Sequence, residues 1–208
     1  MPFGKPIVRR CLLTDLNGIN SVPRPGLTDS VSAAHSDWLF VSVAQQRLWC
    51  LNDCFASAEP SLLELVEEKA TWSCPVSTGL NGVGQEKDSG KTPLGWHQIR
   101  AKIGAGQPLN AVFKGRRPTG EIYSDQLAAR YPNRDWILTR ILWLSGLEPG
   151  RNRLGNRDSM QRFIYFHGTP DSEPMGVPRS HGCIRLRNQD MLTLFDKVHA
   201  GTRVWIGA

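Results

Sequence analysis

Short apolar runs separated by turn residues dominate the patterned part of the chain. Residues 38–43 and 48–51 are apolar runs on either side of the polar pair Gln45-Gln46, which predicts a β-hairpin. The run Phe163-Ile-Tyr-Phe166 is compact and β-prone, so it predicts a buried strand that leads into His167. Further strands are predicted at residues 74–78, 96–99 and 203–206.

Two segments carry apolar residues at helical spacing instead. In residues 57–69 the apolar positions share one helical face, and Pro60 suits the first turn. In residues 188–198 apolar positions recur at steps of three and four, and Asn188 is a candidate cap. Residues 131–144 fit either a strand or a helix, because apolar side chains fill both possible faces.

The balance of these elements predicts a mainly β fold with short helices, in other words a β-rich α+β class. Gly and Pro together contribute 20 and 14 of the 208 residues, which is typical of a chain with many turns. Strands do not alternate regularly with helices, so we expect mostly antiparallel pairing. The length suits one domain, residues 37–208, preceded by an irregular N-terminal extension, residues 1–36.

Positive charge is concentrated in the middle of the chain. The net charge is +6, and residues 100–162 contain twelve Lys or Arg against five Asp or Glu. A basic surface near a site favours an anionic substrate, although a solvated surface explains the same count. The charge is not accompanied by a nucleic-acid-binding motif, so we expect no nucleic acid partner.

The sequence favours a cytoplasmic protein. After Arg9-Arg10 the apolar run is only three residues long, which is too short for a secretory signal. The most apolar stretch, residues 136–144, is interrupted by Arg140, so we expect no membrane span. Five cysteines without framework spacing indicate reduced thiols. A periplasmic location is the alternative if Met1 is not the native start.

One segment concentrates the residues that can perform chemistry. A strand delivers His167, Gly168 permits a sharp turn, and the loop that follows returns the chain to Ser180-His-Gly-Cys183. A cysteine needs a nearby base to become a nucleophile, and a histidine can accept its proton. Gly182 allows close approach of the backbone and offers N–H groups to an oxyanion. Arg185 could lower the thiol pKa or bind a substrate carboxylate.

Structural roles account for the remaining cysteines and histidines. Cysteines outside this segment are expected to be small buried apolar residues; they are Cys11, Cys50, Cys54 and Cys74. A zinc site made of His167, His181 and Cys183 is the alternative chemistry, but catalytic zinc requires a supported set of ligands. We therefore expect no metal ion and no cofactor.

Tyr165-Phe-His-Gly-Thr169 followed by Ser180-His-Gly-Cys-Ile-Arg185 resembles the signature of the L,D-transpeptidase catalytic-domain (YkuD-type) family. Residues 76–79 and 91–95 are similar to the turns that precede the signature in that family. The resemblance extends over residues 37–206 and leaves residues 1–36 unexplained.

The resemblance implies a fold and a set of roles. The fold would be a β-sandwich-like assembly with a lid loop over the catalytic cysteine. Cys183 would be the nucleophile and His167 its base, oriented by the carbonyl group of Gly168. His181 would support the site, and the N–H groups of Gly182 and Cys183 would form the oxyanion hole. The resemblance also implies that substrate would be held by Arg185, Ser180 and Thr169.

The same resemblance implies a substrate and a reaction. Members of the family act on peptidoglycan stem peptides or muropeptides, and they cleave the bond between the L-centre of the third residue and the fourth, D-residue. The acyl group would pass to the thiol as a thioester, and carbapenem-type β-lactams would acylate the same thiol. Transfer to water would make an L,D-carboxypeptidase of muropeptide recycling, which is the favoured outcome. Transfer to an amine would make an L,D-transpeptidase, and a degenerate site would make a peptidoglycan-binding module.

Overall fold

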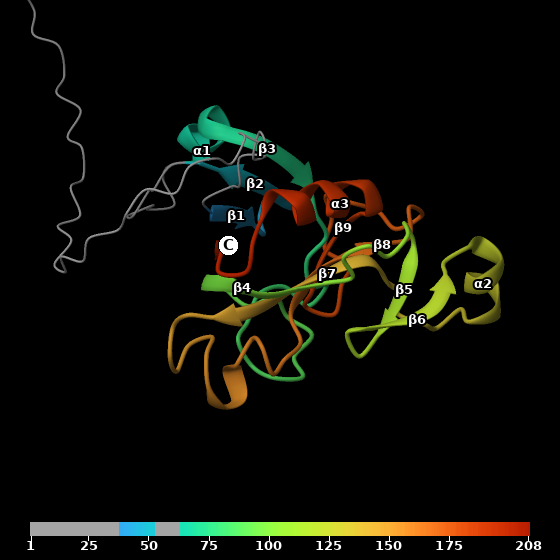
Figure 1. The fold of residues 1–208 in the computed structure, drawn as a ribbon. Helices are drawn as coiled ribbons and strands as arrows, with labels where there is room; N and C mark the ends of the chain where they lie inside the picture. The colour runs from blue at the N-terminus through green and yellow to red at the C-terminus, as the bar shows by residue number, and fades with distance from the viewer. Residues whose placement is uncertain (1–37, 53–62) are drawn as a thin grey trace, which may run out of the picture. The chain divides into compact units, whose positions relative to one another are not determined.

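Ten strands form one curled sheet in the computed structural model, which describes residues 38–52 and 63–208 (Figure 1). The strands are β1 (Trp38–Ser42), β2 (Arg47–Leu51), β3 (Ala70–Pro75), β4 (Gly95–Ile103), β5 (Ala111–Lys114), β6 (Arg117–Ile122), β7 (Ile137–Gly146), β8 (Tyr165–Thr169), β9 (Ile184–Arg187) and β10 (Arg203–Gly207). The helices are α1 (Leu63–Lys69), α2 (Asp125–Arg130), α3 (Asn188–Lys197) and a short 3₁₀ turn, η2 (Gly155–Arg157). The described part of the chain is therefore mainly β with three short α-helices, which confirms the predicted fold class.

Most neighbouring strands are antiparallel. The strand order is β3-β2-β1-β10-β4-β7-β5-β6, and β8 joins the sheet by pairing with β7 and with β9. The parallel pairs among the described strands are β1 with β10 and β8 with β9. The second of these pairs brings the two halves of the chemical motif side by side, although a loop separates them in the sequence.

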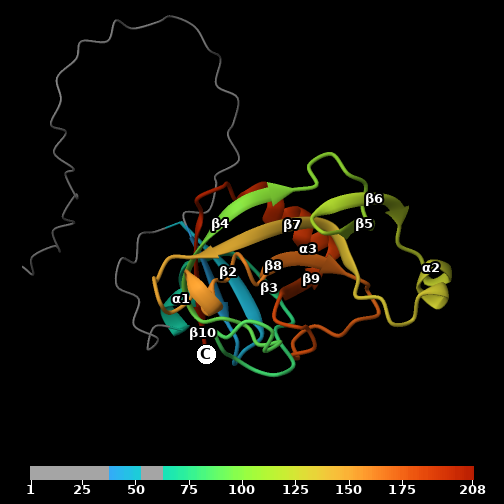
Figure 2. The same ribbon diagram turned by 90° about the horizontal axis from the view of Figure 1, so that it is seen from below.

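The main core lies between the two halves of the curled sheet. Buried apolar side chains from β1, β2, β4 and β10 meet those from β7, β8 and β9 in one cluster. Helix α3 contributes Met191, Leu194 and Phe195 to this cluster and packs on β7, β8 and β9 (Figures 1 and 2). The predicted helical face of this segment is confirmed, since its apolar positions point into the core.

The predicted elements are confirmed where the structure describes them, with differences in extent and type. The strand predicted at residues 74–78 is β3, Ala70–Pro75, and the strand predicted at residues 163–166 is β8, Tyr165–Thr169. The helix predicted at residues 57–69 covers 63–69, and the earlier part of that prediction lies outside the described residues. Residues 137–146 form a strand, which resolves the ambiguous segment. Asn188 does not cap α3: the N-cap is Arg187, and the Asn188 amide instead donates to the carbonyl oxygen of Thr169.

Several sequence predictions concern residues outside the described ranges. The N-terminal extension, with Cys11 and His35, and the segment containing Cys54 and Pro60 belong to this group. Cys50 and Cys74 are described, and both are buried, as predicted. Within the described residues, helix length and apolarity do not reach what a membrane crossing requires.

His97 on β4 is a buried histidine held in its neutral form. Its Nδ1 lies 2.9 Å from the carbonyl oxygen of Gly95, and its Nε2 lies 2.9 Å from the hydroxyl of Ser159. Burial lowers the pKa of His97 to about 4, while the Gly95 carbonyl opposes this shift and the charges of Arg162 and Arg151 reinforce it. The residue is thus a structural link between β4 and the loop that precedes β8.

The depressed pKa of His97 predicts a loss of stability in mild acid. The unfolded chain takes up this proton near pH 6.5 and the folded chain only near pH 4, so the unfolded state binds more protons between these values. The free energy of unfolding should therefore fall as the pH drops through this window, by about 3 kcal/mol at most from this group. Urea midpoints measured from pH 7 to pH 4 should show a shallower decline in His97→Gln than in wild type. His199→Gln, which removes an exposed histidine, is the control. If the urea midpoint of His97→Gln declines with pH as steeply as that of wild type, His97 is not the group responsible.

Candidate active site

The β8–β9 pair places the two halves of the chemical motif on one face. His167 lies opposite Arg185 and Phe166 opposite Ile184 in this parallel register. Because side chains alternate along a strand, Phe166 and Ile184 point together into the main core. The opposite face consequently carries His167 and Arg185. It also carries Cys183, the residue immediately before β9.

His167 is held in one orientation and one tautomer. Its side chain is buried, and its Nδ1 lies 2.8 Å from the carbonyl oxygen of Gly168. A carbonyl oxygen only accepts, so Nδ1 carries the proton and Nε2 keeps its lone pair. Burial lowers the pKa of His167; Asp135 and the Gly168 carbonyl oppose this shift, and the charge of Arg185 adds to it. The ring is therefore a neutral base near pH 7.

Cys183 is a partly exposed thiol in its protonated form. The Sγ–H donates to the carbonyl oxygen of Phe163 at 3.4 Å. The pKa of Cys183 is raised to about 12, chiefly by burial; the Tyr165 backbone hydrogen bond and the charges of Arg185 and Arg162 oppose this shift, and the charge of Asp135 favours it. The thiol of Cys183 and the imidazole of His167 are thus both neutral near pH 7.

A tight turn delivers Cys183 to this position. The hydroxyl of Ser180 donates to the carbonyl oxygen of Cys183 and accepts from the N–H of Gly182 at 3.1 Å. Gly182 has φ +115°, and a Cβ there would lie 2.9 Å from the carbonyl oxygen of Lys91. Thr92 completes the turn by donating to the carbonyl oxygen of Gly182 at 3.0 Å. Ser180 is buried within this turn, and its hydroxyl occupies the N–H of Gly182.

Buried polar contacts support the backbone beneath His167. Thr139 lies at an irregularity in the β7–β8 register, with φ +68°, and its hydroxyl donates to Asn188 Oδ1 at 2.6 Å. The Asn188 amide donates to the carbonyl oxygen of Thr169 at 2.8 Å. A Cβ at Gly168 would collide with Asn188 Oδ1 and would lie 2.8 Å from the carbonyl oxygen of Leu138. The close packing around Gly168 therefore fixes the carbonyl group that orients the imidazole.

Arg185 is committed to carboxylates of the protein. Its side chain is 8% exposed, and its guanidinium lies 2.8 Å from Asp135 Oδ1 and 3.5 Å from Glu173 Oε2. The His181 side chain is 79% exposed, with Nδ1 3.7 Å from Asp135 Oδ2. Asp135 thus connects Arg185 to His181, and the substrate-binding role of Arg185 stays a prediction.

A groove of about 310 Å³ runs beside these charged residues. Thr169, which is buried on β8, and His181 line it together with Arg185, Asp135 and Arg179. The groove thus borders the segment 179–185 that carries Cys183, although neither Cys183 nor His167 lines it.

The segment that approaches Cys183 from the other side is the β5–β6 hairpin. Cys183 packs against a cluster that contains Ala111 and Phe113 of β5 as well as Tyr165. The loop between β8 and β9 instead bonds to the segment that follows β3, through contacts such as Gly176 N–H to the carbonyl oxygen of Val76 at 2.9 Å. Strand β5 of the hairpin, at the right of Figure 1, thus packs near Cys183, and the lid loop that the resemblance implies stays a prediction.

Sequence reasoning missed Asp135 and the hairpin at the site. Asp135 follows the turn residues Pro132 and Asn133 and is far from the motif in the sequence. A hairpin could have been predicted from the pair Gly115-Arg116. This pair follows the short β-prone run Ala111-Val-Phe113 and suits a two-residue turn.

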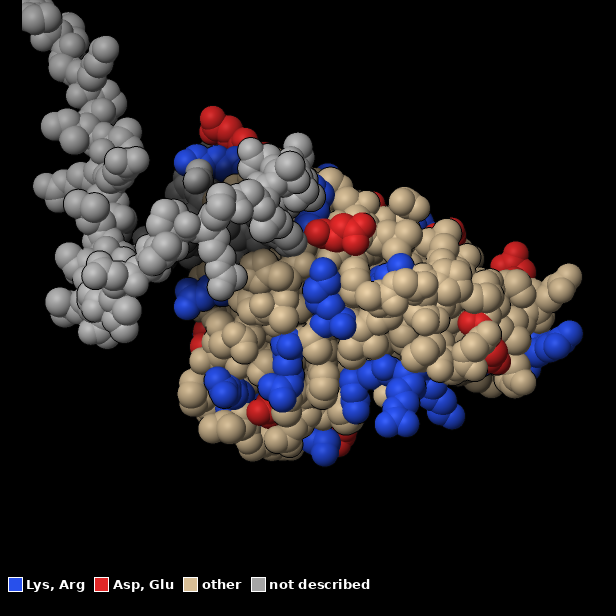
Figure 3. Space-filling model, viewed as in Figure 1, with Lys and Arg blue, Asp and Glu red and all other residues tan. Residues whose placement is uncertain are grey.

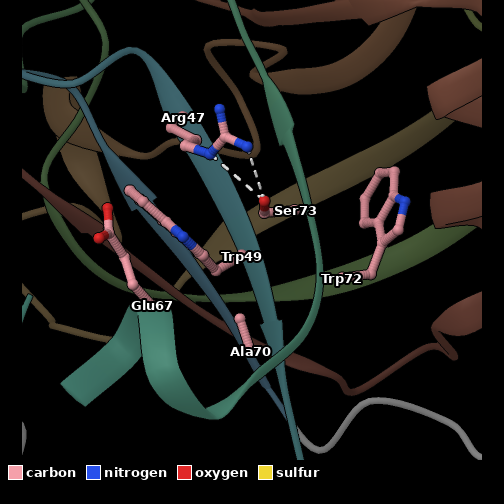
Figure 4. Close-up of a pocket in the computed structure, with 6 residues that line it drawn as sticks. All are labelled: Arg47, Trp49, Glu67, Ala70, Trp72 and Ser73. Carbon is pink, nitrogen blue, oxygen red and sulfur yellow. Dashed lines mark hydrogen bonds between the residues drawn. The ribbon is translucent and has the colours of Figure 1, made fainter. Parts of the chain in front are cut away.

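A second pocket lies away from the motif. It occupies about 460 Å³ between α1, β2 and β3, and is lined by Arg47, Trp49, Glu67, Ala70, Trp72 and Ser73. Figure 4 shows the Arg47 guanidinium bonded to the Ser73 hydroxyl at 2.9 Å within it. The residues of the chemical motif do not line this pocket.

Residues 38–52 and 63–208 contain no group of three or more His, Cys, Asp or Glu side chains that could hold a metal ion. In particular, His181 faces solvent while His167 is buried, so the ligands of the zinc alternative are not gathered.

Basic side chains spread over one face of the molecule. In Figure 3 the Lys and Arg side chains extend across the lower half of the view, over the region of β4 and β7, with few acidic side chains among them. Arg162, which precedes β8, bonds through its guanidinium to the carbonyl oxygens of Gly84, Gln85 and Lys91 at 3.1, 2.9 and 2.6 Å. Its charge lowers the pKa of the nearby Cys183 thiol.

A thiol and an oriented imidazole on one strand face of a mainly β scaffold are the groups that cysteine acyl-transfer enzymes use. The family described as L,D-transpeptidase catalytic domain (YkuD) matches residues 36–206. The chain therefore belongs to the L,D-transpeptidase catalytic-domain family.

Individual relatives match more locally. "Probable L,D-transpeptidase YbiS" of Escherichia coli (strain K12) is 51% identical over 43 residues, which cover 21% of this chain and 14% of the relative. "Probable L,D-transpeptidase ErfK/SrfK" of Salmonella typhimurium is 51% identical over 45 residues, which cover 22% and 15%. Each match thus spans a small part of the relative's length.

Solved structures of L,D-transpeptidases are also similar to this chain. One from Mycobacterium smegmatis has a TM-score of 0.45 and 16% identity over 82% of this chain and 58% of that one. L,D-transpeptidase 3 from Mycobacterium tuberculosis, solved with a faropenem-derived adduct, has a TM-score of 0.45 and 16% identity over 82% and 59%.

Proposed function

We propose that Cys183 is an acyl-transfer nucleophile and His167 its general base, and that the substrate is a peptidoglycan stem peptide. The observation that carries the proposal is the oriented imidazole: Nδ1 of His167 is committed to the carbonyl group of Gly168, on the same strand face as Cys183. An imidazole fixed in this way can accept a proton only at Nε2.

The proposed reaction proceeds through a thioester. The thiol proton passes to Nε2 of His167 while the Sγ atom bonds to the carbonyl carbon of the third stem residue, and the π electrons move to its oxygen. When the tetrahedral intermediate collapses, the C–N bond to the D-residue breaks and the leaving amine takes the proton from His167. The N–H of Gly182 is occupied by Ser180, so we propose that the N–H of Cys183 is the main backbone donor to the oxyanion.

The acceptor of the acyl group has two candidates. Hydrolysis would release a tripeptide, the L,D-carboxypeptidase activity that the sequence favours for a cytoplasmic protein. Transfer to an amine would form a cross-link or exchange the D-residue, and the names of the curated relatives, L,D-transpeptidases, favour this second candidate. A thioester on the partly exposed Cys183 would be accessible to either acceptor.

Incubation with a tetrapeptide muropeptide, with and without a free D-amino acid, tests the proposal. Mass spectrometry should detect tripeptide if water is the acceptor and an exchanged tetrapeptide if the amine is. Iodoacetamide should abolish turnover and a chelator should not. Failure of the wild-type protein to convert any such peptide, despite binding it, would favour a peptidoglycan-binding module instead.

A further inference from the structure

Arg116 occupies a backbone position that is unfavourable for its residue type. It lies in the two-residue turn between β5 and β6, where Lys114 pairs with Arg117. Gly115 has φ +55° and Arg116 has φ +67°, a turn with two positive φ angles that usually selects Asn or Gly. Residues kept in such conformations cluster at binding and catalytic sites, so the side chain of Arg116 merits a functional explanation.

Aromatic side chains hold the Arg116 guanidinium in place. Its Cζ lies 4.6 Å from the ring centroid of Trp143 and 4.9 Å from that of Phe163. One N–H group donates to the hydroxyl of Tyr165 at 3.2 Å. Stacking on rings leaves the edge of the guanidinium, with its remaining N–H groups, available for a planar acceptor.

The Arg116 guanidinium has no carboxylate partner among residues 38–52 and 63–208; its hydrogen bond goes to the neutral hydroxyl of Tyr165. Two other arginines near Cys183 are bonded differently: Arg185 pairs with Asp135 and Glu173, and Arg162 bonds to backbone carbonyl groups. The Arg116 side chain is half-exposed. A fixed, unpaired guanidinium is suited to a carboxylate, which it can bind through two parallel hydrogen bonds.

The Arg116 guanidinium and the Cys183 thiol share two neighbours, Phe163 and Tyr165. The Phe163 carbonyl accepts from Cys183 Sγ, and the Tyr165 backbone forms a hydrogen bond with it. Phe163 itself has φ +58° and a half-exposed ring. A peptide bonded to Cys183 would therefore extend past Phe163 toward Arg116.

We propose that Arg116 is a specificity-determining residue that binds a carboxylate of the acyl-donor peptide. The inference rests on the proposed function, because it takes Cys183 as the attachment point. Two carboxylates of a stem tetrapeptide are within one residue of the scissile bond: a carboxylate on the side chain of the third residue, and the C-terminal carboxylate of the fourth. Both present the same planar acceptor.

Turnover of three tetrapeptides by wild type and Arg116→Gln shows which of the two carboxylates Arg116 binds. One carries both carboxylates, one has the side-chain carboxylate converted to an amide, and one has the C-terminal carboxylate converted to an amide. Arg116→Gln should lower kcat/KM about 10- to 100-fold on the first peptide. It should have less than about threefold effect on whichever amide lacks the group that Arg116 binds. Arg116→Lys should recover part of the loss, since it keeps the charge without the fork.

Binding to the Cys183→Ala protein provides a readout that needs no turnover. Calorimetry with the same three peptides should show the same discrimination, and adding Arg116→Gln to that protein should remove it. Arg117→Gln, an exposed neighbour on β6, is the matched control for a change of net charge. Equal losses on all three peptides, or no loss in Arg116→Gln, would overturn the inference. If binding distinguishes the three peptides but the wild-type protein turns over none of them, the proposed function is wrong while the role of Arg116 in binding stands.

Discussion

Replacing Cys183 by alanine is expected to abolish peptide turnover, and Cys183→Ser should lower the rate by at least about 10²-fold. The thiol is the group that would carry the acyl chain, and a hydroxyl is a far weaker nucleophile beside a neutral imidazole. Burial already raises the pKa of the thiol to about 12, so the site depends on transferring its proton during attack. Both variants should fold normally, because Cys183 is only partly buried. Turnover of a tetrapeptide muropeptide and urea midpoints measure the two effects separately.

A β-lactam provides an independent measurement on the same atom. Incubation with a carbapenem should add the mass of the drug to the wild-type chain and not to Cys183→Ala. Cys74→Ala is the matched control, because Cys74 is a core thiol whose pKa burial also raises. That control should keep both turnover and the adduct. Wild-type activity in Cys183→Ala, or an adduct on it, would remove the nucleophile from this account.

The sequence predicted the nucleophile segment because its parts are local. His167 and Gly168 are consecutive, and residues 180–185 form one turn and the start of one strand. The structure adds their juxtaposition, which comes from parallel pairing of β8 with β9 across a long loop. Such pairing depends on contacts throughout the sheet, so the motif alone could place these residues in one segment but not on one face.

The surroundings of the site could not be predicted in this way. Arg185 was expected to meet either the thiol or a substrate carboxylate, because its residue type suits both. Only the tertiary structure brings Asp135 and Glu173 to its guanidinium. Arg116 is a similar case. Only the tertiary structure shows that its guanidinium stacks on Trp143 and Phe163 and does not pair with a carboxylate.

The ambiguity of residues 131–144 has a physical cause as well. Strand β7 pairs with β4 on one edge and with β8 on the other, and α3 covers one of its faces. Apolar side chains therefore occupy both faces of β7, which removes the alternation that marks a half-exposed strand. The register irregularity at Thr139 further disturbs the pattern, yet it is this irregularity that brings a hydroxyl to Asn188 under Gly168.

His167→Ala is expected to lower kcat/KM by at least about 10²-fold and to change the shape of its pH profile. The pKa of His167 is held below its ordinary value by burial, so the base is neutral at pH 7 and gains a proton only in acid. Wild-type activity should consequently fall only in acid, below the pH at which an ordinary histidine takes up its proton. It should be level between pH 7 and 9, because the thiol does not ionise there. Without the imidazole, the residual rate depends on the small fraction of thiolate, so it should rise steadily with pH over the same range.

His199→Ala is the control for the loss of a histidine. The His199 ring also bonds through Nδ1 to the carbonyl oxygen of the following residue, at 2.9 Å, but it is exposed near the end of α3. Its removal should leave both the rate and the pH profile as in wild type. A His167→Ala profile that is level from pH 7 to 9, merely lowered, would mean that His167 shapes the site without accepting the proton. In that case the base would have to be sought at His181, the other imidazole of the motif, which lies on the exposed side of Asp135.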